Sequence, residues 1–236
     1  LGNKNIGWIK SITTISTPHN GTILADEISL NLPFLQRITP FFGVLHDSWL
    51  ENFYNFDLEH WNLNKKNNES ISNFLNRLST SNIRTSKNFC AWDLSIEGSK
   101  EFNDIYETDN DVYYFSYPTY STKEIYNGSH IPDKSMSPIL WIPALIMGQS
   151  DKLENSWFMN DGIVNTISMN YPTKSDGECA PNKPYDIDTI EMGVWQVMNP
   201  INMDHQLIIG HRISKFDSQN LKRIYYTICS RLYNLK

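Results

Sequence analysis

Two residues that stand far apart in the sequence are of the types that work together in acid–base catalysis. Asp161 lies in "WFMNDGIVNTISMNYP" (157–172), at the end of a presumed strand, and His205 lies in "NMDHQLIIG" (202–210), where another apolar segment begins. A carboxylate that accepts a ring N–H of histidine fixes the tautomer and stabilises the imidazolium. Singly, Asn-Asp-Gly is a turn sequence and a lone histidine is more often structural. Together, the two residues predict a base and its orienting acid.

The nucleophile that such a pair would serve is missing from the sequence. In α/β-hydrolases the catalytic residues follow the order nucleophile, acid, histidine, and the serine occupies a G-x-S-x-G turn. Asp161 and His205 fit the last two places, but the 236 residues contain no G-x-S-x-G. The sequence starts at Leu1, and a strand-like segment follows almost at once. We therefore expect a chain truncated at its N-terminus, with the serine upstream, and we expect residues 1–236 alone to be inactive.

Four segments indicate where the sheet and its connecting turns lie. "SITTIST" (11–17) is rich in β-branched residues, and "DVYYFSYPTY" (111–120) is rich in aromatic residues, and each runs into a proline. Both patterns are typical of strands that end in sharp turns. Shorter apolar segments at 162–169 and 205–210 follow the two candidate catalytic residues.

Two further segments carry apolar residues at helical spacing, and each follows a serine that can cap a helix. Strands separated by such helices favour the α/β class with a mostly parallel sheet. The helices are predicted after Ser70, with Ile71, Phe74, Leu75 and Leu78, and after Ser218, with Leu221, Ile224, Tyr225, Ile228, Cys229 and Leu232.

The stretch 32–48 combines helical spacing of apolar residues with residues that interrupt helices. Its apolar residues include Phe34, Leu35, Ile38, Phe41, Phe42 and Leu45, and it is punctuated by Pro33, Pro40 and Gly43. One interpretation is a buried helix with a kink at a proline. The other is an apolar lid that opens over a site.

Composition limits the classes of protein that this chain can belong to. With 236 residues, 40% of them hydrophobic, it can form one large α/β domain or two small ones. A net charge of −6 gives no basic surface for a nucleic-acid partner. The longest apolar run, "SPILWIPALIMG" (137–148), is broken by two prolines and is shorter than the ~20 residues that cross a bilayer. It predicts buried chain, and no transmembrane segment is expected.

Six segments, taken in order, resemble the secreted triacylglycerol lipases of staphylococci and thermophilic bacilli. They are "SITTISTPHNGT", "YNFDLEHWNL", "CAWDLSIEG", "VYYFSYPTY", "WFMNDGIVNTISM" and "MDHQLIIG". The resemblance runs from about residue 8 to the C-terminal helix, and it corresponds to the later part of a family member. The strand that leads into T-P-H-x-G-T and the N-D-G-I-V-N-T block are its most specific parts.

The resemblance implies a fold, a reaction and a place of action. It implies a single α/β-hydrolase domain over 1–236, in which Asp161 is the acid and His205 the base of a Ser-Asp-His triad. The serine and the oxyanion-hole amides would lie upstream, and 32–48 falls where these lipases have a lid. The substrates would be long-chain acylglycerols met at a lipid–water interface, and the protein would be extracellular. His19, in the T-P-H-x-G-T motif, is expected to be structural.

The metal sites of the family do not transfer to this sequence. Lipases of this type bind calcium through acids two and seven residues after the histidine, where this chain has Leu207 and Arg212. Neither side chain coordinates calcium, and the nearby backbone position at Ser135 cannot compensate alone. An expected zinc ligand aligns with Asn88, which is a poor ligand for zinc. We therefore expect no metal and no other cofactor.

Two alternatives to a lipase remain open from the sequence. The first is a lipase-like domain that has lost catalysis and binds lipid or protein, which the loss of calcium ligands favours. The second is a short-chain esterase, which the lid-like stretch argues against. The retention of both Asp161 and His205 favours an active ester hydrolase.

Overall fold

The protein is described by a computed structural model. The described residues are 7–30, 62–63, 66–70, 73–74, 76–77, 80–81, 87–88, 90–150, 153–211 and 215–235, without the side chains of 28–30 and 215–216. The lid-like segment 32–48 lies outside them, as does Arg212.

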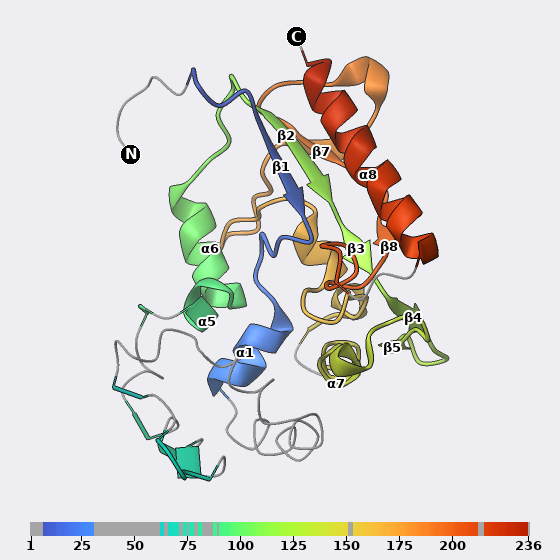
Figure 1. The fold of residues 1–236 in the computed structure, drawn as a ribbon. Helices are drawn as coiled ribbons and strands as arrows, with labels where there is room; N and C mark the ends of the chain where they lie inside the picture. Colours follow the sequence, from blue (N-terminus) through green and yellow to red (C-terminus); the bar gives the residue numbers. More distant parts are fainter. Residues whose placement is uncertain are drawn as a thin grey trace.

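A four-stranded parallel sheet forms the centre of the described structure (Figure 1). Its order is β1-β2-β7-β6, with Ser11 opposite Tyr113 and Ile15 opposite Tyr117 in the first pair. The strands are β1 (Ser11–Ile15), β2 (Tyr113–Tyr117), β7 (Trp195–Val197) and β6 (Asn182–Pro184), and each neighbouring pair is parallel. The α/β class and the mostly parallel sheet are therefore confirmed.

Shorter elements extend the carboxyl end of this sheet and connect its strands. β3 (Thr119–Tyr120) pairs with β8 (Ile201–Asn202) in parallel, and β4 (Thr122–Glu124) pairs with β5 (His130–Pro132) antiparallel. The remaining elements are the helices α1 (Ile23–Leu30), α5 (Cys90–Asp93), α6 (Ile96–Ile105), α7 (Trp141–Met147) and α8 (Lys215–Tyr233), and the 3-10 helices η3 (Pro138–Leu140), η4 (Asn155–Trp157), η5 (Thr166–Met169) and η6 (Ile187–Thr189).

The alternation of side chains along β2 builds a core on each face of the sheet. Phe115 and Tyr117 pack with Ile228 of α8 on one face. Tyr114 packs with Trp195 on the opposite face. Figure 1 shows α8 on one side of the sheet and α6 on the other, with α1 and α7 beyond the carboxyl ends of the strands.

The two predicted strands and the helix predicted after Ser218 are observed, whereas Ile71, Leu75 and Leu78 of the helix predicted after Ser70 lie outside the described residues. The segment 111–120 forms β2 and β3 on either side of Pro118, and the helix after Ser218 is α8, which begins earlier, at Lys215. Near Ser70, residues 73–74 and 76–77 are helical, and Ser70 Oγ accepts the backbone N–H of Asn73 at 3.2 Å. Ser70 therefore caps this helix as predicted.

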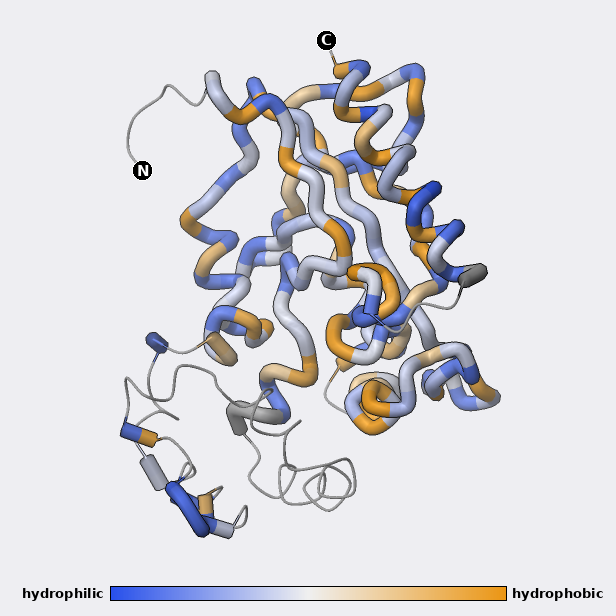
Figure 2. Tube along the Cα trace, viewed as in Figure 1, coloured by the Kyte–Doolittle hydropathy of each residue, from blue (hydrophilic) through white to orange (hydrophobic). Residues whose placement is uncertain are grey.

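The apolar segments that follow the candidate catalytic residues are not strands. Residues 162–165 form bends and an isolated bridge, 166–169 form η5, and 205–210 are turns. The run 137–148 forms η3 and α7, which is largely orange in Figure 2. Ala144 and Met147 are buried there as expected, but Trp141 is exposed. No helix of the described chain is long and apolar enough to span a membrane.

We predict that the contact of α8 with the sheet contributes strongly to stability. Ile228 is 6% exposed, whereas Tyr226 on the same helix is 78% exposed. Ile228→Ala should lower the free energy of unfolding by about 2 to 4 kcal/mol, because it leaves a cavity against Phe115 and Tyr117. Urea denaturation measures this, with Tyr226→Ala as the control at below about 0.5 kcal/mol. Equal losses in the two variants would contradict the packing.

Candidate functional site

The two residues predicted to work together are in contact. His205 Nδ1 lies 2.9 Å from Asp161 Oδ2. The backbone N–H of His205 also donates to the carbonyl oxygen of Asp161 at 3.0 Å, so the histidine is held by its main chain as well as its ring. A carboxylate accepts and does not donate, so Nδ1 carries the hydrogen and Nε2 holds the free electron pair. Nothing in the described part of the chain forms a hydrogen bond with Nε2.

Asp161 is fully buried, and its carboxylate is surrounded by donors. Oδ1 accepts the backbone N–H groups of Ile163 at 3.0 Å and Val164 at 2.9 Å. Oδ2 accepts the hydroxyl of Thr119 at 2.8 Å as well as the ring of His205. A buried charge is tolerated only when it is paired and hydrogen-bonded in this way. The acid is therefore oriented from both of its oxygens.

The Asn-Asp-Gly sequence builds a turn around this acid. Asn160 pairs with Asn165 in an isolated bridge, and Asn160 Oδ1 accepts the N–H of Gly162 at 2.9 Å. Gly162 has φ +99°, which a side chain would disfavour. The expectation that Asp161 ends a strand is wrong, because the turn's own polar groups satisfy the backbone here. Asp161 is a turn residue and, at the same time, the partner of His205.

Asp204 holds the loop that carries His205, and sequence reasoning did not single it out. Its Oδ2 accepts the N–H of Ser137 at 2.7 Å, which ties the loop to the segment before η3. Its Oδ1 accepts the N–H groups of Gln206 and Leu207 at 2.9 and 2.7 Å. The local signal is an aspartate that caps the turn after it, which is common enough in loops to carry no functional message.

The pKa of His205 reflects opposing effects. Burial of the ring lowers this pKa, but the hydrogen bond to Asp161 and the negative charges of Asp161 and Asp204 raise it. The net effect is a pKa above the ordinary value for histidine. The protonated ring is therefore stabilised, as a base that receives a proton during a reaction requires.

His19 lies in a different environment from His205. Its Nε2 is 3.0 Å from Thr14 Oγ1, and its ring meets that of Trp195 edge-on at a centroid distance of 4.5 Å. Burial lowers the pKa of His19 to about 4, so this ring is neutral near pH 7. These contacts fit the structural role expected for it.

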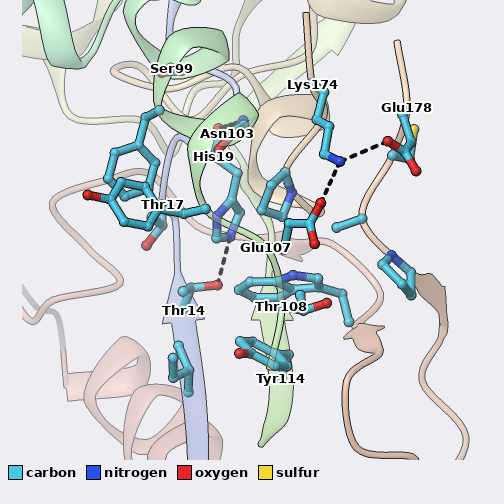
Figure 3. Close-up of a pocket in the computed structure, with 18 of the residues that line it drawn as sticks. Thr14, Thr17, His19, Ser99, Asn103, Glu107, Thr108, Tyr114, Lys174 and Glu178 are labelled. Atoms are coloured by element: carbon cyan, nitrogen blue, oxygen red, sulfur yellow. Dashed lines mark hydrogen bonds and ion pairs between the residues drawn. The ribbon is translucent and has the colours of Figure 1, made fainter. Parts of the chain in front are cut away.

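A pocket of about 930 Å³ opens between the sheet and α6, and Figure 3 shows its lining. Thr14 and His19 line it, and Lys174 bridges Glu107 and Glu178 at 2.8 Å each along its rim. Neither Asp161 nor His205 lines it. The contact between acid and base, and not this pocket, therefore defines the candidate site.

Metal ligands do not gather in the described chain. No group of three or more histidine, cysteine, aspartate or glutamate side chains there is placed to hold an ion. Leu207, at a position where a calcium ligand would be needed, instead donates its backbone N–H to Asp204. The expectation of no metal remains a prediction.

Comparison with known proteins gives the family. The sequence matches the family described as "Lipase-like, C-terminal domain" over residues 2–235. The chain belongs to this family. It is similar to the lipase of Staphylococcus hyicus, with 30% identity over 231 residues that are 97% of this chain and 35% of the relative. It is also similar to the lipase of Staphylococcus epidermidis, with 29% identity over 91% of this chain and 29% of the relative.

Solved structures extend the match to the fold. The crystal structure of Staphylococcus hyicus lipase superposes with a TM-score of 0.68 at 30% identity, over 94% of this chain and 56% of that one. EstA from Clostridium botulinum superposes with a TM-score of 0.72 at 32% identity, over 99% of this chain and 57% of that one. This lipase-like domain therefore has the α/β-hydrolase fold, and it spans about a third of the curated lipases and just over half of the solved chains.

We predict that Gly162 is required for the turn that holds the acid in this lipase-like domain. A Cβ at position 162 would lie 2.7 Å from Leu140 Cβ, and φ is positive. Gly162→Ala should therefore lower the free energy of unfolding by about 2 to 5 kcal/mol. Gly177 also has positive φ but no neighbour within 4 Å, so Gly177→Ala should cost only about 1 to 2 kcal/mol. Chemical denaturation compares the two, and an equal loss would argue against the clash with Leu140.

We also predict that the charge of Asp161 sets the protonation of His205. Asp161→Asn removes a charge that raises the pKa of His205 while burial still lowers it, so this pKa should fall. In the native domain, stability from the protonated ring is present below the unfolded pKa and is lost as pH rises through the higher folded pKa. NMR titration of the His205 ring measures the shift. The exposed Asp176→Asn is the control, and a pKa unchanged by Asp161→Asn would contradict the contact.

Proposed function

We propose that this domain supplies the acid and the base of a carboxylic ester hydrolase, and that the protein containing it is a triacylglycerol lipase. The observation that carries the proposal is the 2.9 Å contact between Asp161 Oδ2 and His205 Nδ1. The names of the relatives, which are lipases, support this class of substrate.

In the proposed reaction His205 acts first as a base and then as an acid. A serine hydroxyl attacks the ester carbonyl carbon while Nε2 of His205 takes its proton, and Asp161 stabilises the imidazolium that forms. The tetrahedral intermediate collapses, and the imidazolium protonates the departing alcohol. Water, deprotonated by Nε2, then attacks the acyl-enzyme and releases the carboxylic acid with the free serine. The arrangement suits this cycle, because the His205 side chain is 32% exposed while Asp161 is fully buried.

The serine is proposed to come from a segment that precedes this chain. Within the described residues, β1 lies at one end of the sheet and pairs only with β2. A parallel strand on the open side of β1 would end at the same edge of the sheet as the site. A strand, tight turn and helix at that position is the setting of a nucleophilic serine in α/β-hydrolases. The chain of 236 residues alone is accordingly expected not to hydrolyse tributyrin.

The proposed substrate determines the proposed setting. Long-chain acylglycerols are insoluble, so the enzyme would act at a lipid–water interface, without metal or other cofactor. Its resemblance to secreted lipases supports an extracellular location. The segment 32–48 would act as the lid. A greater rate on emulsified than on dissolved esters would distinguish a lipase from a short-chain esterase.

We predict that both members of the pair are needed for turnover in the intact protein. Asp161→Asn should lower kcat on tributyrin roughly 10⁴-fold, because an amide no longer fixes the tautomer of His205. His205→Ala should lower it at least as far. The exposed Asp176→Asn is the matched control. If Asp161→Asn lowers kcat by less than about tenfold, Asp161 has only a role in the turn. If the intact protein hydrolyses no ester, the alternative of a lipase-like domain that binds lipid or protein without catalysis is favoured.

A further inference from the structure

The carboxylate oxygen that binds His205 has a second partner, the hydroxyl of Thr119. Thr119 Oγ1 lies 2.8 Å from Asp161 Oδ2, and His205 Nδ1 lies 2.9 Å from the same oxygen. Thr119 is fully buried. It is the first residue of β3, where the chain continues from β2 beyond the end of the sheet. Its hydroxyl is therefore placed by the backbone of a central strand.

Ser16 completes a chain of hydroxyl groups behind the acid. Ser16 Oγ lies 2.6 Å from Thr119 Oγ1, and Ser16 is 4% exposed. A hydroxyl has one hydrogen to donate. The carboxylate oxygen at 2.8 Å can only accept and lies nearer than the alternative acceptor, Met169 Sδ, at 3.5 Å, so we assign the hydrogen of Thr119 to the carboxylate. Ser16 is then the donor to Thr119. The two hydrogen bonds therefore point the same way: Ser16 donates to Thr119, and Thr119 donates to Asp161. Hydrogen bonds aligned in this way strengthen each other.

The backbone holds both hydroxyl groups rigidly. Ser16 directly follows β1 and adopts φ +53°, which residues with a side chain rarely take, while its N–H donates to the carbonyl oxygen of Tyr117 at 3.1 Å. The N–H of Thr119 lies 3.1 Å from Met169 Sδ, and its carbonyl oxygen accepts the hydroxyl of Thr166 at 2.8 Å. Unusual backbone geometry that its surroundings hold in place is a feature of functional sites.

We propose that Thr119 is a positioning residue for the reaction, and that Ser16 supports it by donating to its hydroxyl. Oδ1 of Asp161 is fixed by the turn at Ile163 and Val164, but Oδ2 must stay in line with His205 through the whole catalytic cycle. The hydroxyl of Thr119 holds Oδ2 through a contact that does not involve the histidine. The inference rests on the proposed function of Asp161 and His205.

The loss of this hydroxyl has a defined consequence. In Thr119→Val, Oδ2 keeps a single partner, and the carboxylate is free to rotate away from His205. The histidine is then less well oriented in the transition state. Thr119 is fully buried, so its hydroxyl is not available to the substrate and substrate binding is unaffected. We expect kcat on tributyrin to fall roughly 10- to 100-fold with KM unchanged, since a hydrogen bond to a charged group is lost.

The experiment uses the intact protein and separates the hydroxyl from the methyl group. Thr119→Val removes the hydroxyl at constant volume, and Thr119→Ser keeps it and should recover most of the lost kcat. Thr14→Val on β1, whose hydroxyl bonds His19, is the matched control and should leave kcat within threefold. The proton NMR signal of His205 Nδ1–H gives a readout that does not depend on turnover. It should shift in Thr119→Val and return towards its native position in Thr119→Ser.

The outcomes distinguish this inference from the proposed function. A tenfold or greater loss of kcat in Thr119→Val, with recovery in Thr119→Ser and a displaced Nδ1–H signal, supports the positioning role. A smaller loss, or an equal loss in Thr119→Ser, overturns it, even if Asp161→Asn and His205→Ala abolish turnover. If those two variants keep full activity, the proposed function itself fails. Should Thr119→Val not fold, Ser16→Ala decides, since an unchanged Nδ1–H signal and kcat there would refute the hydroxyl chain.

Discussion

The buried carboxylate of Asp161 is the constraint on which the site depends. With 0% exposure it cannot draw on water, so each oxygen must find donors within the protein. The turn supplies two backbone N–H groups, β3 supplies the hydroxyl of Thr119, and the loop after β8 supplies the ring of His205. Three segments from different parts of the sequence are thereby brought to one point. The carboxylate of Asp161 therefore holds these segments together and also orients the ring of His205.

The parallel sheet makes that convergence possible. In a parallel sheet the carboxyl ends of the strands share one edge, and the loops that follow them meet there. Ser16 directly follows β1, Thr119 begins β3 just after β2, and His205 follows β7 and β8. The sheet is held from both faces, by Phe115 and Ile228 on one side and by Trp195 and its neighbours on the other. The packing of α8 thus supports the strand that leads to Thr119.

The limits of sequence reasoning follow from the range of the interactions. β1, β2 and α8 were predictable because their patterns are local, and the pairing of Asp161 with His205 was predictable from their types and order. β6 and β7 were not, because strands of three residues give no pattern of their own. Helix α6 was not, because its buried positions are Gly98, Ser99 and Asn103 and give no apolar stripe. The hydroxyl contact between Ser16 and Thr119 depends on the alignment of β1 with β2, which no local pattern specifies. The apolar residues after Asp161 suggested a strand but pack as turns around the acid.

The turn at Asp161 and the role proposed for its carboxylate depend on the same arrangement of backbone donors. A turn directs successive backbone N–H groups towards the side chain of its aspartate, and here Ile163 and Val164 do so. Those donors stabilise a charge that would otherwise be too costly to bury, and only a buried charge acts on an imidazole with little screening by water. Gly162 permits the backbone angle that brings the donors into place. A sequence that strongly forms a turn is therefore a suitable setting for the acid, and the turn signal alone cannot argue against catalysis.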